Sequence, residues 1–188
     1  MNHDHLILLV EDREEDALLF VDALKKAGLD HPLFLVSDGV EAMNYLGGKV
    51  LYADRTKFPI PKILMLDLSL PRINGWDVLR WVRAQPELNK MLVVVLTSST
   101  RPSDLSLAYQ MGANSFLTKP CSVTDLKNLA RAFPKYWSRG QESQPSSSAG
   151  RSAGASEQDP GSGGKTSPGD TTLHLCREGT LHGISRLK

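Results

Sequence analysis

Four short apolar runs of this chain each end in side chains that can take part in chemistry. In chain order these side chains belong to Glu11, Asp12, Asp67, Thr97 and Lys119. If the runs are neighbouring strands of a parallel sheet, their carboxyl ends lie at one edge and the five residues converge. Three carboxylates, a hydroxyl and an ammonium group suit a divalent cation together with a phosphoryl group. The pattern therefore predicts a site in which Asp67 carries a phosphate.

Asp67 is central to this prediction because it ends a buried apolar run. A carboxylate in such a place is unfavourable unless it is paired or binds a metal ion. Glu11 and Asp12 end another run in the same way. Three acids brought together repel one another, which favours a hard cation with oxygen ligands, and we expect Mg²⁺. Bound Mg²⁺ would also offset the charge of an incoming phosphoryl donor.

Lys119 and Thr97 complete the expected site. The Lys119 ammonium can place a positive charge beside phosphoryl oxygens or beside Asp67 itself. The Thr97 hydroxyl can donate a hydrogen bond to a phosphoryl oxygen. Carboxylate nucleophiles are known to form aspartyl phosphates, and the added negative charge gives both groups something new to bind.

The apolar runs belong to a regular alternation of expected strands and helices. Continuous apolar runs, typical of strands buried on both faces, occupy residues 6–10, 33–36, 63–66 and 91–96, and a short fifth strand is expected at residues 114–118. Apolar residues at helical spacing follow them in residues 14–27, 38–46, 75–84, 102–112 and 122–137. This alternation predicts an α/β fold, a doubly wound five-stranded parallel sheet with right-handed crossovers and helices on both faces.

Composition divides the chain of 188 residues into two parts. Residues 1–138 carry the expected strands and helices and have the length of one ordinary domain. Residues 139–188 are rich in Ser, Gly, Pro and Gln, and such a segment buries too little apolar surface to offset its ordering entropy. We therefore expect a low-complexity, disordered C-terminal tail, with a frayed extension at residues 172–188.

Charge, hydropathy and cysteine content argue against several classes of function. A formal net charge of +1 disfavours nucleic acid as the main partner. No run approaches the about 18 apolar residues of a membrane span, and the first run is too short for a signal peptide. Cys121 and Cys176 match no disulfide or metal spacing, which fits a cytoplasmic protein. His3, His5 and His31 show no metal spacing either and are expected on the surface or in loops.

Taken together, the matched positions resemble the receiver domains of two-component response regulators. Receivers share an acidic pair after the first strand, an Asp after the third, Thr or Ser after the fourth and Lys-Pro after the fifth. The pair Glu11-Asp12, Asp67, Thr97 and Lys119-Pro120 match this pattern, and the resemblance covers residues 5–137. It implies a flavodoxin-like sheet of strand order 2-1-3-4-5. The sequence around these positions also resembles, more narrowly, the stand-alone regulators paired with phytochrome-type sensor histidine kinases.

The resemblance implies a role for each residue around the phosphate. Asp67 would be the phosphoacceptor, and Asp67 and Asp12 would be direct Mg²⁺ ligands. Glu11 would act on the cation through a water molecule, and the backbone carbonyl of Ser69 would be a further ligand. Glu11 stands where Asp is commoner in the family and is one methylene longer, so it would hold the cation less directly.

The resemblance also implies a switch, an output surface and partners. Thr97 and Phe116 would be the switch pair, in which the hydroxyl moves towards the phosphate and the ring turns inward. The output surface would comprise the fourth helix, fifth strand and fifth helix, here Arg101–Trp137, and homodimerisation through it is expected. A sensor histidine kinase or a phosphotransfer protein would donate the phosphate. No DNA-binding or kinase segment follows residue 138, so we expect a single-domain regulator that acts through protein–protein contacts.

Two alternative functions would use the same fold. A Mg²⁺-dependent aspartyl-phosphate hydrolase usually carries a second acid two residues after its nucleophile as general acid. That position is Ser69 here, which favours a signalling protein over an enzyme. The other alternative is a binding module that works without phosphorylation, and the complete set of acids, hydroxyl and amine argues against it.

Overall fold

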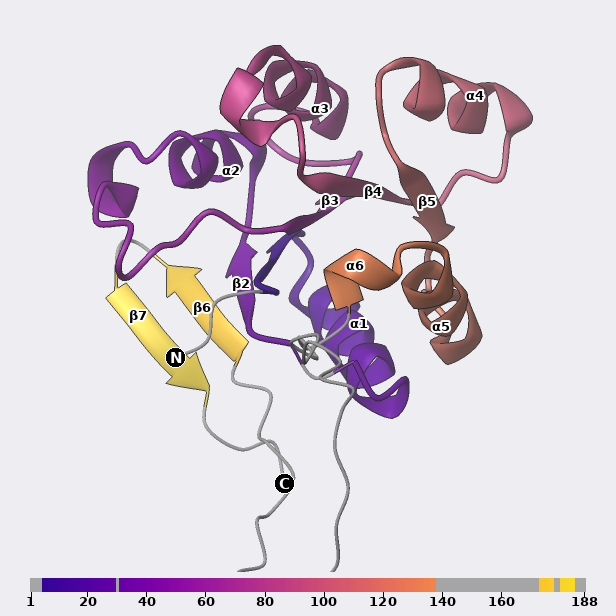
Figure 1. Cartoon of the computed structure of the whole chain (residues 1–188), viewed down its shortest axis with the longest axis horizontal. Coiled ribbons are helices and arrows are strands. Elements are labelled where there is room, and N and C mark those ends of the chain that lie inside the picture. The colour runs from indigo at the N-terminus through magenta and orange to yellow at the C-terminus, as the bar shows by residue number, and fades with distance from the viewer. Residues whose placement is uncertain (1–4, 30, 138–172, 178–179, 185–188) are drawn as a thin grey trace, which may run out of the picture.

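The computed structural model describes residues 5–29, 31–137, 173–177 and 180–184, which are built around a central sheet. The first five strands of this sheet are parallel and have the spatial order 2-1-3-4-5, as predicted (Figure 1). The strand order therefore reverses beside β1, which is where sheets of this kind bind ligands. Their bounds are β1 (Ile7–Val10), β2 (Leu33–Val36), β3 (Ile63–Asp67), β4 (Leu92–Thr97) and β5 (Ser115–Thr118).

Helices cover both faces of the sheet. Helices α1, α5 and α6 lie on one face, and α2, α3 and α4 lie on the other (Figure 1). No helix in the described part of the chain is long and apolar enough to cross a membrane. The bounds are α1 (Glu14–Lys26), α2 (Gly39–Leu46), α3 (Gly75–Ala84), α4 (Pro102–Gln110), α5 (Val123–Ala132) and α6 (Pro134–Trp137), with short 3-10 turns η1 (Val50–Tyr52) and η2 (Pro86–Leu88).

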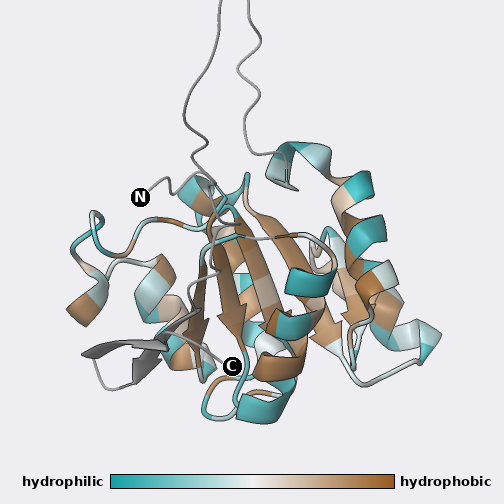
Figure 2. Cartoon of the chain, turned by 90° about the horizontal axis from the view of Figure 1, so that it is seen from below, coloured by the Kyte–Doolittle hydropathy of each residue, from teal (hydrophilic) through white to brown (hydrophobic). Residues whose placement is uncertain are grey.

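Alternate residues of each strand point to opposite faces and build two apolar cores. On β1, Leu8 packs on the side of α2 and α3, Leu9 packs on the side of α1 and α5, and both are fully buried. Strands β1 to β4 are buried along their length because both faces are covered. Figure 2 shows the strands in brown between helices with teal outer surfaces. Residues that directly follow these packed strands are therefore held in defined positions.

Polar side chains begin three of the helices. Asp38, Asn74 and Ser122 cap α2, α3 and α5, and each accepts the backbone N–H three residues further on at 2.9 to 3.1 Å. Such caps satisfy N–H groups that have no partner within the helix. Ser122 and Asp125 have the spacing of a capping box, but the Asp125 carboxylate accepts the Ser122 hydroxyl at 2.6 Å.

The last predicted helix is wrong in its length. Helix α5 ends at Ala132, and α6 begins separately at Pro134. Proline has no N–H to donate within a helix and disfavours helical backbone at the residue before it. Phe133 accordingly has φ −128° and ψ 56°, outside the helical region. The break lets Trp137 pack into the core on the side of α1 and α5, where it is 7% exposed.

The sheet extends beyond the five predicted strands. Strand β6 (Leu173–Arg177) pairs in parallel with β2, and β7 (Thr180–Ile184) pairs antiparallel with β6 (Figure 1). The sequence analysis expected no strands there. Without β6, the outer side of β2 would be a sheet edge with unpaired N–H and C=O groups, and backbone pairing satisfies them without a large apolar core. Residues 138–172, the larger part of the predicted tail, lie outside the described residues.

Aromatic side chains close the sheet at the amino ends of its strands. The ring centroid of His31 lies 5.6 Å from the ring centroid of His5 and 5.4 Å from that of Trp137. His5 Nδ1 lies 2.9 Å from the Tyr136 carbonyl oxygen, and the Tyr136 hydroxyl donates to the Lys90 carbonyl oxygen at 2.8 Å. We call His5, His31, Tyr136 and Trp137 the amino-edge cluster. His31 lies in a loop, as predicted, but it is buried rather than on the surface.

Candidate functional site

The register of the strands brings the predicted site residues to one edge of the sheet. The residues directly before Glu11 on β1 and before Asp67 on β3 are register partners. On β4, the residue before Thr97 is the partner of Asp67, and Thr97 itself pairs with the residue before Lys119. Four separate stretches of sequence therefore end side by side, as the apolar runs predicted.

Three carboxylates form a compact group at this edge. Glu11, Asp12 and Asp67 each offer an oxygen, and these oxygens lie within 4.8 Å of one another. Glu11 and Asp67 are 3% and 4% exposed, whereas Asp12 is exposed to solvent. A hard divalent cation takes oxygen ligands and commonly keeps several waters on its open side. The group therefore fits such a cation and forms an acidic metal-binding triad.

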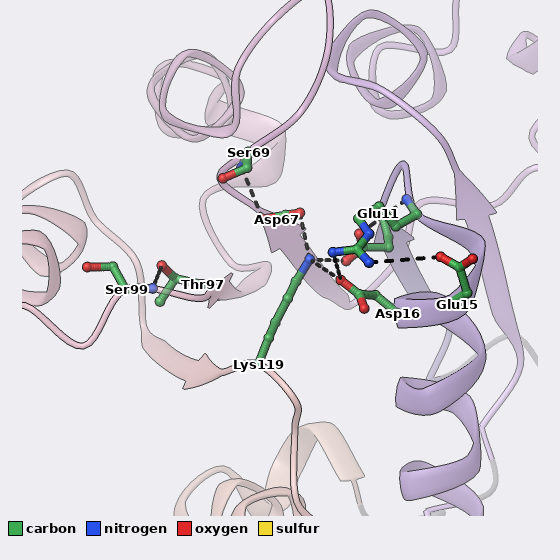
Figure 3. A network of polar contacts seen from close by, with 9 residues as sticks. Glu11, Glu15, Asp16, Asp67, Ser69, Thr97, Ser99 and Lys119 are labelled. Carbon is green, nitrogen blue, oxygen red and sulfur yellow. Dashed lines mark hydrogen bonds and ion pairs between the residues drawn. The ribbon is translucent and has the colours of Figure 1, made fainter.

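Lys119, which directly follows β5, contacts two of these carboxylates. Its Nζ lies 2.6 Å from Asp67 Oδ2 and 3.4 Å from Asp16 Oδ2, and it also pairs with Glu11 Oε2 (Figure 3). The Lys119 side chain is largely buried, so these pairs are shielded from water. Charge-assisted hydrogen bonds of this kind are stronger than neutral ones. The ammonium is thus held directly against the carboxylate that is expected to carry the phosphate.

The pKa values of both Lys119 and Glu11 are raised at this edge of the sheet. Burial lowers the pKa of Lys119, but the hydrogen bonds and charges of Asp67 and Glu11 outweigh burial and raise this pKa above its usual 10.5. Burial raises the pKa of Glu11 above its usual 4.5, and the Asp67 charge adds to the rise although Lys119 opposes it. One ammonium therefore does not neutralise the acids, and a bound cation would relieve their repulsion.

The backbone holds Asp67 tightly from the side of α3. The Ser69 N–H donates to Asp67 Oδ1 at 3.0 Å, while Oδ2 faces Lys119. Gly75, the first residue of α3, approaches so closely that a Cβ there would lie 2.1 Å from the Asp67 carbonyl oxygen. Only glycine fits such an approach without moving the backbone. The carboxylate of Asp67 is therefore fixed at both oxygens.

Thr97 lies at the same edge but outside this ion-pair network. It is buried, and its Oγ1 accepts the Ser99 N–H at 3.0 Å (Figure 3). Phe116 on β5 is half-buried, and its ring meets Tyr109 of α4 edge to face with centroids 5.8 Å apart. The structure thus brings Asp67, Glu11 and Lys119 into contact, whereas Thr97 contacts its own loop.

A pocket of about 320 Å³ opens beside Lys119, between α1 and the residues that precede α5. Its lining includes Leu19, Phe20 and Cys121. Burial raises the pKa of the Cys121 thiol to about 12, so the thiol is protonated and a poor nucleophile at neutral pH. His3 and the side chain of Cys176 lie outside the described part of the chain.

Asp16 is the site residue that the sequence analysis missed. It comes from the first turn of α1, and its carboxylate contacts both Lys119 and Arg13. Among the acids of that turn, the helical period offers a signal. Asp16 lies four residues before Phe20, which is buried, so the two share the inner face of α1. Glu14 and Glu15 lie on exposed positions.

Comparison with known proteins agrees with this geometry. Residues 7–131 match the family model of the response regulator receiver domain. Response regulator Rcp1 of Synechocystis sp. (strain ATCC 27184 / PCC 6803 / Kazusa) is 35% identical over 136 residues, which are 72% of this chain and 90% of Rcp1. A solved structure of the Mn²⁺-bound form of response regulator Rcp1 has a TM-score of 0.58 and 33% identity, and covers 76% of this chain and 99% of that chain.

Two further solved structures belong to phytochrome response regulators. The phosphorylated cyanobacterial phytochrome response regulator RcpA is 32% identical with a TM-score of 0.59, over 71% of this chain and 93% of that chain. The bacteriophytochrome response regulator AtBRR is 34% identical with a TM-score of 0.64, over 73% of this chain and 98% of that chain. The more narrow resemblance seen in the sequence is therefore confirmed.

The family model spans strands β1 to β5 together with the acidic group and Lys119. These residues form a pocket for phosphorylation, with a carboxylate to receive the phosphoryl group and a metal-binding triad beside it. The chain thus belongs to the response regulator receiver domain family and is a phosphoacceptor signalling protein, similar to phytochrome and bacteriophytochrome response regulators.

Proposed function

We propose that this chain accepts a phosphoryl group on Asp67 from a sensor histidine kinase or a phosphotransfer protein, in a reaction that needs Mg²⁺. One observation carries the proposal. Asp67 is a buried carboxylate whose two oxygens are separately held, one by the Ser69 N–H and one by Lys119, with the acids of the triad within 4.8 Å. Such fixed geometry suits a nucleophile that must meet a phosphorus atom in line.

The residues of the site account for the transfer step. An Asp67 oxygen forms a bond to the donor's phosphorus atom, while the bond from phosphorus to a nitrogen or oxygen of the donor breaks and the donor keeps the electron pair. Lys119 already donates a hydrogen bond to Asp67, and its ammonium can stabilise the negative charge that develops on the phosphoryl oxygens. A divalent cation, when bound, supplies positive charge to those oxygens. Asp12 and Glu11, which stand beside Asp67, are the other residues that would hold it.

Mg²⁺ is the cation that the donor set supports. All three side chains of the triad offer oxygen only, and Asp12 is open to solvent, where a hydrated cation can keep its waters. The Mn²⁺-bound form of Rcp1 supports a divalent cation of similar preference in this family. We assign Asp12 and Asp67 as direct ligands, Glu11 as a ligand through water, and the Ser69 carbonyl as a further ligand.

The switch is assigned to Thr97 and Phe116. Thr97 ends β4 one residue past the partner of Asp67, so a change of rotamer can bring its hydroxyl towards a phosphate. This movement would free the Ser99 N–H and leave space for Phe116 to turn inward from Tyr109. Phosphorylation would then bias an equilibrium between two arrangements that exist beforehand.

The surface from Arg101 to Trp137 is the proposed output surface and dimer contact. Leu107 and Tyr109 of α4 are large apolar residues that remain about half exposed there. Contact between proteins, rather than contact with nucleic acid, is the proposed output, in keeping with the net charge of +1 of the whole chain. A phytochrome-type sensor histidine kinase in the cytoplasm is the proposed donor, because RcpA and AtBRR are phytochrome response regulators.

The test is phosphorylation by a small donor. Purified full-length protein is incubated with acetyl phosphate and Mg²⁺, and its intact mass is measured beside that of Asp67→Asn. We expect the mass of one phosphoryl group on the wild type and none on the variant. Equal labelling of both proteins would overturn Asp67 as the acceptor. A folded wild type that gains no mass at any Mg²⁺ concentration would overturn the function itself.

A further inference from the structure

Lys119 has an acidic partner that does not belong to the metal-binding triad. Its Nζ contacts three carboxylates, from Glu11, Asp67 and Asp16. The first two are members of the triad, and the third is not. Asp16 also comes from a helix, α1, whereas the triad lies at the carboxyl ends of β1 and β3. Figure 3 shows Asp16 projecting from the helix towards the Lys119 ammonium.

The three carboxylates do not contact the ammonium equally, and a bound cation would change their relative importance. In the metal-free structure Asp67 is nearer to Nζ, at 2.6 Å, than Asp16, at 3.4 Å. The raised pKa of Lys119 accordingly comes from Asp67 and Glu11. A divalent cation on the triad would neutralise much of the charge of these two acids. Asp16 would then be the carboxylate in contact with the ammonium whose negative charge is least neutralised.

The position of Asp16 is fixed well enough for this role. Its side chain is 23% exposed, and Arg13 Nη1 lies 3.8 Å from its carboxylate on the other side. Phe20, one turn further along the same face, is 4% exposed and anchors this part of α1 in the core. Ordering the carboxylate therefore costs less entropy than it would on a free surface.

A phosphoryl group on Asp67 would need the same ammonium. Phosphorylation adds nearly two negative charges, and Lys119 is the one cationic group in contact with Asp67 among the described residues. Asp16 would compete with the phosphoryl oxygens for Lys119 and would also repel them. A carboxylate at this distance from the ammonium is close enough for that competition to be measurable.

We propose that Asp16 is a positioning residue for Lys119, one that holds the ammonium when a cation is bound and weakens its contact with the phosphoryl group. This inference rests on the proposed function. It predicts that Asp16 sets how strongly the site binds a phosphoryl group or its mimic, without being needed for the fold or for metal binding. Asp16→Asn keeps the shape of the side chain and removes its charge.

The test compares Asp16→Asn with Glu15→Gln in the full-length chain. Glu15 is the matched control, because its carboxylate lies 4.0 Å from the same Arg13, is 81% exposed and makes no contact with Lys119 among those the structure describes. Binding of beryllium fluoride, a mimic of the phosphoryl group, is followed by ¹⁹F NMR at saturating Mg²⁺. We expect Asp16→Asn to bind the mimic about three- to tenfold more tightly than wild type, and Glu15→Gln to differ by less than about twofold.

A second readout excludes a general change of structure. The ¹⁵Nζ signal of Lys119, observed with Mg²⁺ and no phosphoryl mimic, should shift in Asp16→Asn and stay in place in Glu15→Gln. Equal affinities and unshifted Lys119 signals in both variants would overturn the role of Asp16 while leaving the proposed function intact. A wild type that binds no mimic, although folded and supplied with Mg²⁺, would instead overturn the proposed function and this inference with it.

Discussion

The two ends of the sheet are built on opposite principles. At the carboxyl ends of the strands, Glu11 and Asp67 are buried acids beside the exposed Asp12, and the Lys119 ammonium pairs with both buried acids. At the amino ends, the amino-edge cluster of His5, His31, Tyr136 and Trp137 closes the sheet with rings and two backbone contacts. The first end keeps like charges together, whereas the four described residues of the amino-edge cluster pack their rings and include no acid.

This difference separates function from stability. Acids that repel one another raise the free energy of the folded protein, and they remain because a cation and a phosphoryl group need them. The amino-edge cluster has no such demand, so its residues can contribute to stability alone. Mutations at the two ends should therefore change the free energy of unfolding in different ways.

The largest effect is expected at the amino-edge cluster. Trp137→Ala removes a large ring that is 7% exposed, and the free energy of unfolding should fall by about 4 kcal/mol. Urea denaturation of metal-free protein measures this. Trp137→Phe is the control and should cost much less, because the buried indole N–H has no hydrogen-bond partner in the described residues. A Trp137→Ala protein as stable as wild type would show that the amino-edge cluster does not stabilise the fold.

The next effect concerns the ammonium group of Lys119. Lys119→Met leaves the buried acids without their ammonium, and the free energy of unfolding at neutral pH should fall by about 3 kcal/mol. Because folding raises the pKa of Lys119 above 10.5, its contribution is complete below pH 10.5 and is lost as the pH rises through the raised value. The difference in the free energy of unfolding between wild type and Lys119→Met should therefore become smaller at alkaline pH. A constant gap from pH 7 to 11 would speak against the ion pairs.

Binding of Mg²⁺ should stabilise the protein by a smaller amount. At a concentration about ten times its dissociation constant, a ligand specific for the folded state adds about 1.4 kcal/mol. The gain should be largely lost in Asp12→Asn, which removes one of the three oxygen donors, and should be retained in Glu15→Gln. Thermal unfolding with Mg²⁺ and with EDTA measures this. An equal gain in Asp12→Asn would place the cation elsewhere.

The smallest effect has the opposite sign from the first two. Asp67→Asn removes one of the repelling acids but keeps a side-chain oxygen for the Ser69 N–H, so metal-free protein should gain about 1 kcal/mol. The same variant should gain nothing further from Mg²⁺ beyond nonspecific salt effects. Urea denaturation in EDTA decides the sign. A clear loss of stability would mean that the pair with Lys119 outweighs the repulsion between the acids.

Much of this arrangement is visible in the sequence, because the strands β1 to β4 are long apolar runs. Such runs show where a buried strand ends, and Asp67 and Lys119 stand at those ends. Parallel strands then leave little choice about which edge the residues share. Helix starts were equally readable from Asp38 and Ser122, whose side chains cap backbone N–H groups.

The remaining features depend on tertiary contacts that local patterns indicate at most in part. Asp16 is one of three acids in a row, and only packing of Phe20 decides that it faces Lys119. Trp137 continues a helical pattern in the sequence, and it packs into the core on the side of α1 and α5 because the helix breaks before Pro134. Pairing of β6 with β2 depends on an edge far away in the sequence. Each of these is a tertiary contact that overrides or selects among local preferences.

The most direct test of the central claim is to locate the phosphate in the sequence. The protein is phosphorylated with acetyl phosphate and Mg²⁺ and treated with borohydride, which reduces an aspartyl phosphate to homoserine. It is then digested and sequenced by tandem mass spectrometry. We predict homoserine at position 67 and at no other acid of the site. Homoserine at position 12 or 16 instead, with Asp67 unchanged, would contradict the account.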